Sequence, residues 1–153
     1  MGGHEDLQQY ESKTSFILQD EEEAKVFNVT LESVLAGHQE AVSSIKWAMR
    51  SEESKEARTL QDFCFLSSSF DFTVCVWKPE ADTGVWSVES TLGAMQGNKH
   101  AYFGALFLED DREILAHTFN GAMHQWKKSA DGKWVPQLTV KGHFGEVTDL
   151  DWD

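Results

Sequence analysis

Positive charge is scarce in this sequence, which has 13 lysine and arginine residues against 26 aspartate and glutamate residues and a formal net charge of −13. Affinity for a nucleic-acid backbone comes largely from lysine and arginine contacts with phosphate. The basic residues also form no stripe along the sequence. We therefore expect neither a nucleic-acid-binding face nor attraction to an anionic membrane.

Long apolar runs, secretory features and cysteines are also few. No apolar stretch reaches the roughly 18 residues of a membrane-spanning helix. The start, Met-Gly-Gly-His-Glu-Asp, lacks the basic and apolar regions of a signal peptide. We therefore expect Cys64 and Cys75 to be buried thiols in a reducing compartment, with a disulfide between them as the alternative. The expected location is the cytoplasm, with the nucleus as a second option.

Motifs of known catalytic chemistry are missing as well. The sequence contains no HExxH pattern, no CxxC pair and no nucleophile elbow. Four histidines, His100, His117, His124 and His143, occur among many acidic residues and leave a metal-dependent or hydrolytic enzyme as a remote alternative. Because two of them align with ordinary strand positions, we expect no enzymatic activity, no metal and no cofactor.

The most informative stretch that is present reads LSSSFDFTVCVW and covers residues 66–77. Its residues alternate on either side of a central corner, a pattern that predicts a β-hairpin. Ser69, Asp71 and Trp77 can converge on this hairpin, and His38 from an upstream Gly-His pair can join them. Together these four side chains predict a buried polar network in which every hydrogen-bonding group has a partner.

The same pattern recurs farther along the chain, at a period typical of repeat proteins. Residues 66–77 align without gaps on residues 115–126, LAHTFNGAMHQW. A Gly-Asn pair precedes this second copy where the first copy has Gly-His. The alignment predicts a degenerate second tetrad made of Asn98, Thr118, Asn120 and Trp126.

A third copy begins with the Gly-His pair at residues 142–143, and we expect His143 to serve the tetrad of that next repeat. The first repeat is the enlarged one, because 60 residues separate His38 from Asn98 whereas 45 separate Asn98 from His143. Most of the excess lies in the charged stretch 49–62. This stretch has no apolar periodicity and is expected to be a surface loop.

These repeats predict an all-β chain that forms part of a β-propeller. A propeller needs about four to eight four-stranded blades to close its ring, whereas this sequence accounts for about two complete blades and single strands of the flanking blades. We interpret it as a piece of a larger ring. The expected segments are an acidic mobile stretch (1–24) and a partial propeller (25–153), the latter comprising an orphan outer strand (25–36), the enlarged blade (37–92), a second blade (93–141) and the first strand of the next blade (142–153).

This arrangement resembles the WD40 repeat proteins and, more narrowly, the family of subunit 2 of the Elongator complex. The resemblance covers about residues 31–153. It is carried by LESVLAGH (31–38), SSSFDFTVCVW (67–77), AHTFNGAMHQWK (116–127) and KGHFGEVTDLDWD (141–153).

The resemblance implies a non-catalytic scaffold subunit of the Elongator complex, which supports the modification of wobble uridines in transfer RNA. The implied partners are the catalytic subunit and the largest subunit of that complex, with no membrane involved. Another WD40 adaptor, such as a substrate receptor of a ubiquitin ligase, is the main alternative. Neither residues nor resemblance indicate which loops bind partners.

Three residues depart from the WD40 pattern. Lys78 stands where the repeat usually has aspartate, and Asn98 and Asn120 replace the histidine and aspartate of the second tetrad. An asparagine pair still forms hydrogen bonds, but it loses a charge-assisted contact that is about twice as strong as a neutral one. We therefore expect the second blade to be the weaker of the two.

Overall fold

The computed structural model describes residues 14–19, 24–31, 33–48, 59–93, 100–108 and 111–151. These residues form ten β-strands in antiparallel sheets and the short 3₁₀ helix η2 (Leu60–Asp62), which confirms the predicted all-β class. Residues 49–58 of the expected surface loop lie outside these ranges. In the ranges described, no helix combines the length and the apolar character needed to cross a membrane. The chain divides into two compact units, Met1–Val34 and Leu35–Asp153.

The first unit contains an antiparallel hairpin of β1 (Ser15–Gln19) and β2 (Ala24–Asn28). Phe16 and Phe27 are paired across it with ring centroids 5.3 Å apart. Two features differ from the expectations: residues 15–19, within the stretch expected to be mobile, form a strand, and the strand expected over residues 25–36 ends at Asn28. Local pairing explains both differences, since each apolar segment satisfies its backbone and covers an aromatic ring by pairing with the other.

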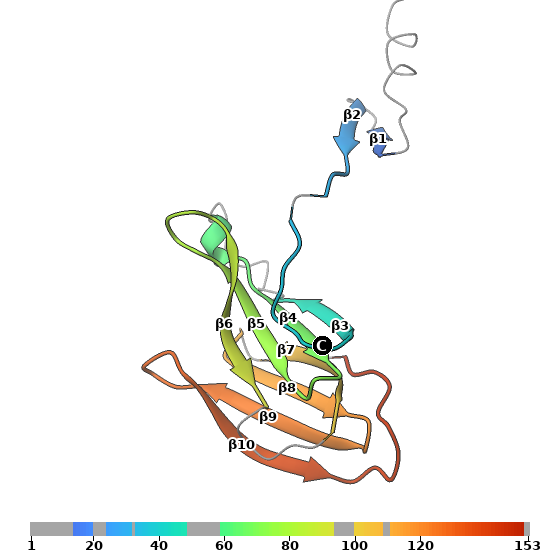
Figure 1. Cartoon of the computed structure of the whole chain (residues 1–153), viewed down its shortest axis with the longest axis vertical. Helices are drawn as coiled ribbons and strands as arrows, with labels where there is room; N and C mark the ends of the chain where they lie inside the picture. Colours follow the sequence, from blue (N-terminus) through green and yellow to red (C-terminus); the bar gives the residue numbers. More distant parts are fainter. Residues whose placement is uncertain are drawn as a thin grey trace, which may run out of the picture. The chain divides into compact units, whose positions relative to one another are not determined.

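The second unit begins with a four-stranded antiparallel sheet whose strands lie in chain order (Figure 1). Its two central strands are buried along almost their whole length, which explains their small and apolar composition. The sheet lies within the segment 37–92 assigned to the enlarged blade. Its strands are β3 (Val42–Trp47), β4 (Phe65–Ser69), β5 (Val74–Pro79) and β6 (Trp86–Leu92).

A second antiparallel sheet follows and has the same meandering order (Figure 1). It lies within the segment 93–141 assigned to the second blade. The edge strand β10 is largely exposed and contains Pro136, whose missing N–H is tolerated at an edge or a bulge. The strands of this sheet are β7 (Tyr102–Leu108), β8 (Glu113–Thr118), β9 (Ala122–Lys128) and β10 (Trp134–Lys141).

The segment after β10 differs from its prediction. Residues 142–151 form no strand, although the first strand of a next blade was expected over residues 142–153, of which the last two lie outside the described ranges. A strand needs a neighbour for its backbone hydrogen bonds. Here a side chain supplies one of these bonds, as the Nδ1 atom of His117 lies 2.5 Å from the carbonyl oxygen of Val147.

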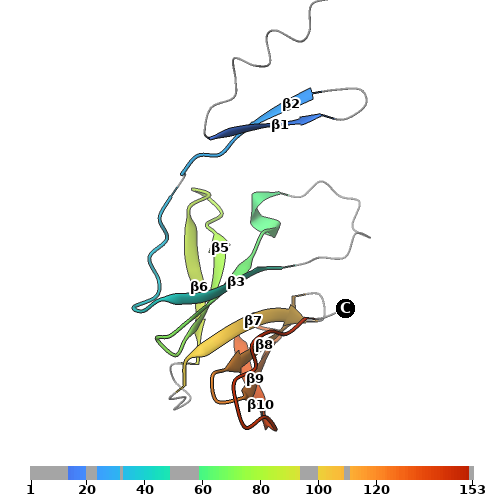
Figure 2. The ribbon, with the colours of Figure 1, turned by 90° about the vertical axis from the view of Figure 1, so that its right-hand side faces the viewer.

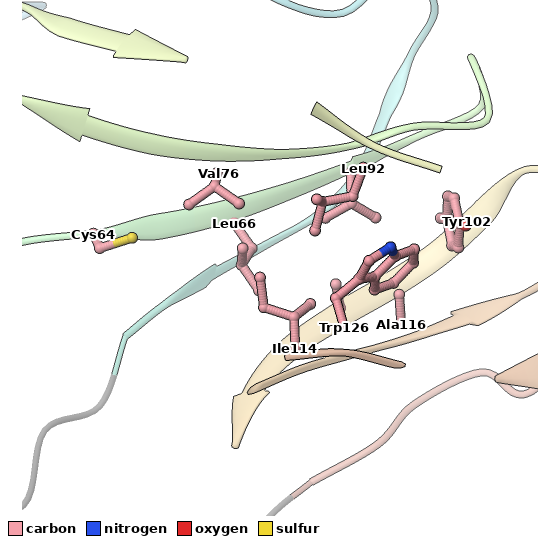
Figure 3. Packing of buried hydrophobic residues seen from close by; sticks show 10 residues of the cluster. Cys64, Leu66, Val76, Leu92, Tyr102, Ile114, Ala116 and Trp126 are labelled. Carbon is pink, nitrogen blue, oxygen red and sulfur yellow. The ribbon is translucent and has the colours of Figure 1, made fainter. Parts of the chain in front are cut away.

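The main hydrophobic core lies between the two sheets (Figure 3). Strand β7 packs against β3 and β4, and Figure 2 shows β7 beside β3. The Ser43 hydroxyl donates to the Tyr102 carbonyl oxygen at 2.8 Å. Burial of one side chain of valine, leucine or phenylalanine size contributes roughly 1.5–3 kcal/mol, so this shared core holds the sheets together. The buried residues are Cys64, Leu66, Val74, Val76, Leu92, Tyr102, Ala105, Ile114, Ala116 and Trp126.

The other face of the first sheet carries an aromatic cluster. Phe65 stacks on Trp77 with centroids 5.7 Å apart and contacts Trp86 at 5.1 Å. Cys75 belongs to this cluster, whereas Cys64 belongs to the core between the sheets, and both cysteines are free thiols. The two thiols therefore lie on opposite faces of one sheet, which separates them.

Candidate functional site

A chain of hydrogen bonds links two side chains of the first sheet to two side chains of its adjoining loops. The Nδ1 atom of His38 lies 3.0 Å from Oδ2 of Asp71, and its Nε2 atom lies 2.7 Å from Oγ of Ser67. The Trp77 indole nitrogen donates to the same Ser67 oxygen at 2.7 Å. The carboxylate can only accept, so Nδ1 carries the hydrogen and Nε2 accepts from the serine hydroxyl.

The structure brings His38, Asp71 and Trp77 together as expected, but the serine of this network is Ser67. The predicted serine, Ser69, instead donates weakly to the Glu40 carbonyl oxygen at 3.3 Å and accepts from the Asp71 backbone N–H at 3.1 Å. Both serines lie on the same face of β4. Ser67 pairs with Cys75 of β5, two residues before Trp77, and therefore lies beside the indole. Ser69 lies where the chain enters the turn.

Asp71 holds the turn as well as the histidine. Its carboxylate accepts from the backbone N–H of Gln39 at 2.9 Å, and from the backbone N–H and hydroxyl of Thr73 at 3.0 and 2.5 Å. Burial alone raises the pKa of Asp71, but the hydrogen bonds from Thr73, Gln39 and His38 outweigh it and lower the pKa below its ordinary value of 3.8. The carboxylate is thus ionised and ties two loops to each other.

The imidazole of His38 is enclosed, with a side chain only 4% exposed. Burial alone lowers the pKa of His38, but its contacts with Cys75 and Asp71 outweigh burial and raise the pKa above the ordinary 6.5. The preceding residue, Gly37, makes this enclosure fit, because a Cβ atom there would lie 2.7 Å from the Trp77 ring. The Gly-His pair is therefore a packing requirement as well as a hydrogen-bonding one.

The chain of Ser67, His38 and Asp71 has the connectivity that activates a serine nucleophile in hydrolases. Its setting does not allow that chemistry. Ser67 is 4% exposed, and its oxygen already accepts a hydrogen bond from Trp77. No substrate can reach this oxygen, so the network acts by holding strands and loops in position.

In the described residues, the second sheet lacks this network. Ala116 stands at the position equivalent to Ser67, so no hydroxyl is present there. The equivalent indole, that of Trp126, is buried, and its nitrogen has no hydrogen-bond partner within the described part of the chain. Thr118 contacts Asn120 and the Ala122 carbonyl oxygen, which stabilises the turn only. The predicted participant Asn98 lies outside the described residues.

His117 has a role that the sequence did not reveal. It is 3% exposed, it binds the Val147 carbonyl oxygen, and its ring lies so close to β7 that a Cβ atom on Gly104 would be 2.6 Å from its Nε2 atom. Burial lowers the pKa of His117 and outweighs the opposing effect of the Val147 carbonyl. Alignment with Ser68 had assigned it an ordinary strand position, because nothing local marks a contact 30 residues away.

The other described histidines are His100, His124 and His143. His100 and His143 are exposed, and His124 contacts Thr139 at 3.3 Å and packs against Trp126 with ring centroids 6.0 Å apart. Among the residues with described positions, no group of three or more histidine, cysteine and acidic side chains is arranged to hold a metal ion. His143, expected in the tetrad of a next repeat, has no hydrogen bond within this part of the chain.

Lys78, the departure from the repeat pattern, takes part in an ion cluster. Its Nζ atom lies 3.0 Å from Oε1 of Glu89, and the Nζ atom of Lys128 lies 3.4 Å from the same oxygen. The first two residues belong to β5 and β6, whereas Lys128 belongs to β9. The cluster therefore links the two sheets, although partly exposed pairs contribute only about 0–1 kcal/mol each.

Comparison with known proteins shows which proteins this chain is similar to. No protein-family model matches the chain. Elongator complex protein 2 of Dictyostelium discoideum is 40% identical over 127 residues, which cover 81% of this chain and 14% of that protein. The human protein of the same name is 36% identical over 143 residues, covering 92% of this chain and 17% of the relative. The Arabidopsis thaliana protein of that name is 33% identical over 132 residues, with 82% and 16% covered.

The chain spans 14 to 17% of the length of these relatives, so it corresponds to a small part of each. Similarity at this level extends across eukaryotes as distant as an amoeba, a mammal and a plant. The chain belongs to the Elongator complex protein 2 family.

Proposed function

We propose that this chain is part of a non-catalytic scaffold subunit of the Elongator complex and supports the modification of wobble uridines in transfer RNA. The observation that carries the proposal is the identity with Elongator complex protein 2 over more than four-fifths of the chain. The structure supports it because the most elaborate polar network is enclosed and serves to position loops. The proposed location is the cytoplasm, with the nucleus as a second site.

The way in which the two sheets are built supports the proposed scaffold role. Each places small and apolar residues on faces that pack against a neighbour, and each ends in turns whose geometry is fixed by side-chain hydrogen bonds. Rigid turns on a packed support are suited to holding partner proteins. The proposed partners are the catalytic subunit and the largest subunit of the complex. An adaptor of a ubiquitin ligase is less well supported, because the matched relatives carry the Elongator name.

Affinity purification of the complete tagged protein tests this proposal. We expect the catalytic and largest subunits of the complex to be recovered with it, and we expect cells without it to lose wobble-uridine modification. A Leu138→Ser variant is a suitable control, because Leu138 is 73% exposed on an edge strand and its replacement should leave recovery unchanged. Recovery of neither subunit with the wild-type protein would overturn the proposal.

A further inference from the structure

An aromatic row crosses the boundary between the two sheets at one end. Phe70 follows β4 and Phe119 follows β8, at equivalent positions of the two repeats. Their rings stack with centroids 5.1 Å apart, and Phe119 contacts Phe103 at 4.7 Å. Phe70 is nevertheless 42% exposed. The row thus presents aromatic surface to solvent at the turns, away from the core between the sheets.

Phe72, two residues after Phe70, adds an anomaly. Its φ angle is 68°, in the left-handed region that is unfavourable for a bulky side chain. The equivalent residue of the second repeat is Gly121, which adopts φ 79° without that cost. The strained Phe72 is 44% exposed, so burial of its ring does not offset the strain. A strained residue with an exposed aromatic ring indicates a role outside the fold of its own chain.

The loops around these rings carry charge of one sign. We call this surface the turn end and define it as residues 37–41, 69–73, 118–122 and 142–147. Hydrogen bonds connect the first two segments, from the Phe70 N–H to the Ala41 carbonyl oxygen at 3.1 Å and from the Gln39 N–H to Asp71 at 2.9 Å. The fourth segment lies against the third at Gly121. The charged residues of the turn end are Glu40, Asp71 and Glu146, with no lysine or arginine.

We propose that the turn end, centred on Phe70 and Phe72, is the docking surface for a segment of a partner Elongator subunit that presents apolar side chains flanked by lysine or arginine. Exposed aromatic residues are typical anchors of protein interfaces. The exposed carboxylates of Glu40 and Glu146 select basic flanks and repel phosphate, which disfavours a nucleic acid. A second copy of this chain also carries −13 and would be repelled. This inference rests on the proposed function, since it needs a partner subunit.

The sharpest test replaces Phe72 by glycine in the complete protein. Glycine relieves the backbone strain and removes the ring, so Phe72→Gly should leave the thermal unfolding midpoint unchanged or higher. Calorimetric titration with the purified catalytic and largest subunits should show binding to one of them weakened by about tenfold or more, as expected for loss of an interface anchor. A residue with only a structural role would not combine unchanged or increased stability with weaker binding.

Two further variants sharpen the result. Glu40→Gln removes an exposed charge without changing packing and should weaken binding by about twofold to fivefold at low salt, with less effect at high salt. Val85→Ser is the matched control, because Val85 is 59% exposed at the opposite end of the first sheet, between β5 and β6, and should bind as wild type.

The outcomes separate this inference from the proposed function. If the wild-type protein binds the subunits and Phe72→Gly binds them equally well, the docking surface is wrong and the proposed function stands. If the wild-type protein binds neither subunit, the proposed function fails. If Phe72→Gly instead abolishes self-association or binding of transfer RNA, one of those occupants replaces the partner segment and the inference is overturned.

Discussion

The Trp77 indole donates to the Ser67 hydroxyl at 2.7 Å, and this contact distinguishes the two sheets. The equivalent pair in the second sheet is Trp126 and Ala116, where the indole nitrogen is buried without a partner in the described part of the chain. Because this hydroxyl is missing, the second sheet has no hydrogen-bond chain from the tryptophan through this position to the loop. The relative strength of the two repeats can be tested at these positions.

Removal and addition of this hydroxyl should have opposite effects. Ser67→Ala leaves both the Trp77 indole and the Nε2 atom of His38 without a partner, and an unpaired buried group costs about 1–3 kcal/mol. Ala116→Ser offers a partner to the Trp126 indole and should add about 1 kcal/mol. Chemical denaturation of the complete protein measures both. A larger loss for Ser69→Ala than for Ser67→Ala would contradict the assignment of the network.

The turn carboxylate should matter more in the first repeat than its amide counterpart in the second. Asp71→Ala removes the acceptor for His38, Gln39 and Thr73, so we expect a loss of about 1–3 kcal/mol. Asn120→Ala should cost less, because the contacts of Asn120 within the described residues are all with its own turn. Equilibrium unfolding of the complete protein compares the two, and equal or reversed losses would show that the tetrad does not stabilise the first repeat.

The pair of Asp71 and His38 should give stability a defined pH dependence. The pKa of Asp71 is lowered from 3.8, so its contribution is present above that pH and is lost as the pH falls through the folded value. The pKa of His38 is raised from 6.5, so its contribution is present below 6.5 and is lost as the pH rises through the folded value. Asp71→Asn should therefore destabilise most between these two pH values.

His117 supplies the matched comparison, because burial lowers its pKa from 6.5. Its contribution is present above 6.5 and is lost as the pH falls toward the folded value. The melting temperature of the wild-type protein minus that of His117→Gln should therefore shrink on acidification from about pH 8 to about pH 5. The same difference for Asp71→Asn should grow over this range, and parallel behaviour of the two variants would contradict the opposite pKa shifts of His117 and His38.

Gly104 should be intolerant of any side chain. A Cβ atom at this position would lie 2.6 Å from Nε2 of His117, so Gly104→Ala must displace that ring and weaken its bond to the Val147 carbonyl oxygen. Overpacking of this kind costs about 1–3 kcal/mol. Gly145→Ala is the control, because no atom of the described residues lies within 4 Å of a Cβ atom there. Similar unfolding free energies for the two variants would refute the close approach of His117.

Local features of this protein follow from its sequence alone. Alternating residues and the corner at Phe70–Phe72 predicted the β4–β5 hairpin, and the gapless repeat predicted the second sheet. The spacing of His38, Asp71 and Trp77 was sufficient to bring them together, since the ladder fixes which residues share a face. The resemblance to the Elongator subunit 2 family was also drawn from these motifs.

The packing of the strands decides contacts that the spacing of residues in the sequence does not predict. Ser67 and Ser69 point to the same face, and only the ladder register places the first beside the indole of Trp77. Likewise, His117 reads as an ordinary strand residue until Val147 is brought back against it from 30 residues away. Hairpin periodicity is a local property of the backbone, whereas the choice between two equivalent hydroxyls and the contact of a distant carbonyl depend on how completed strands pack.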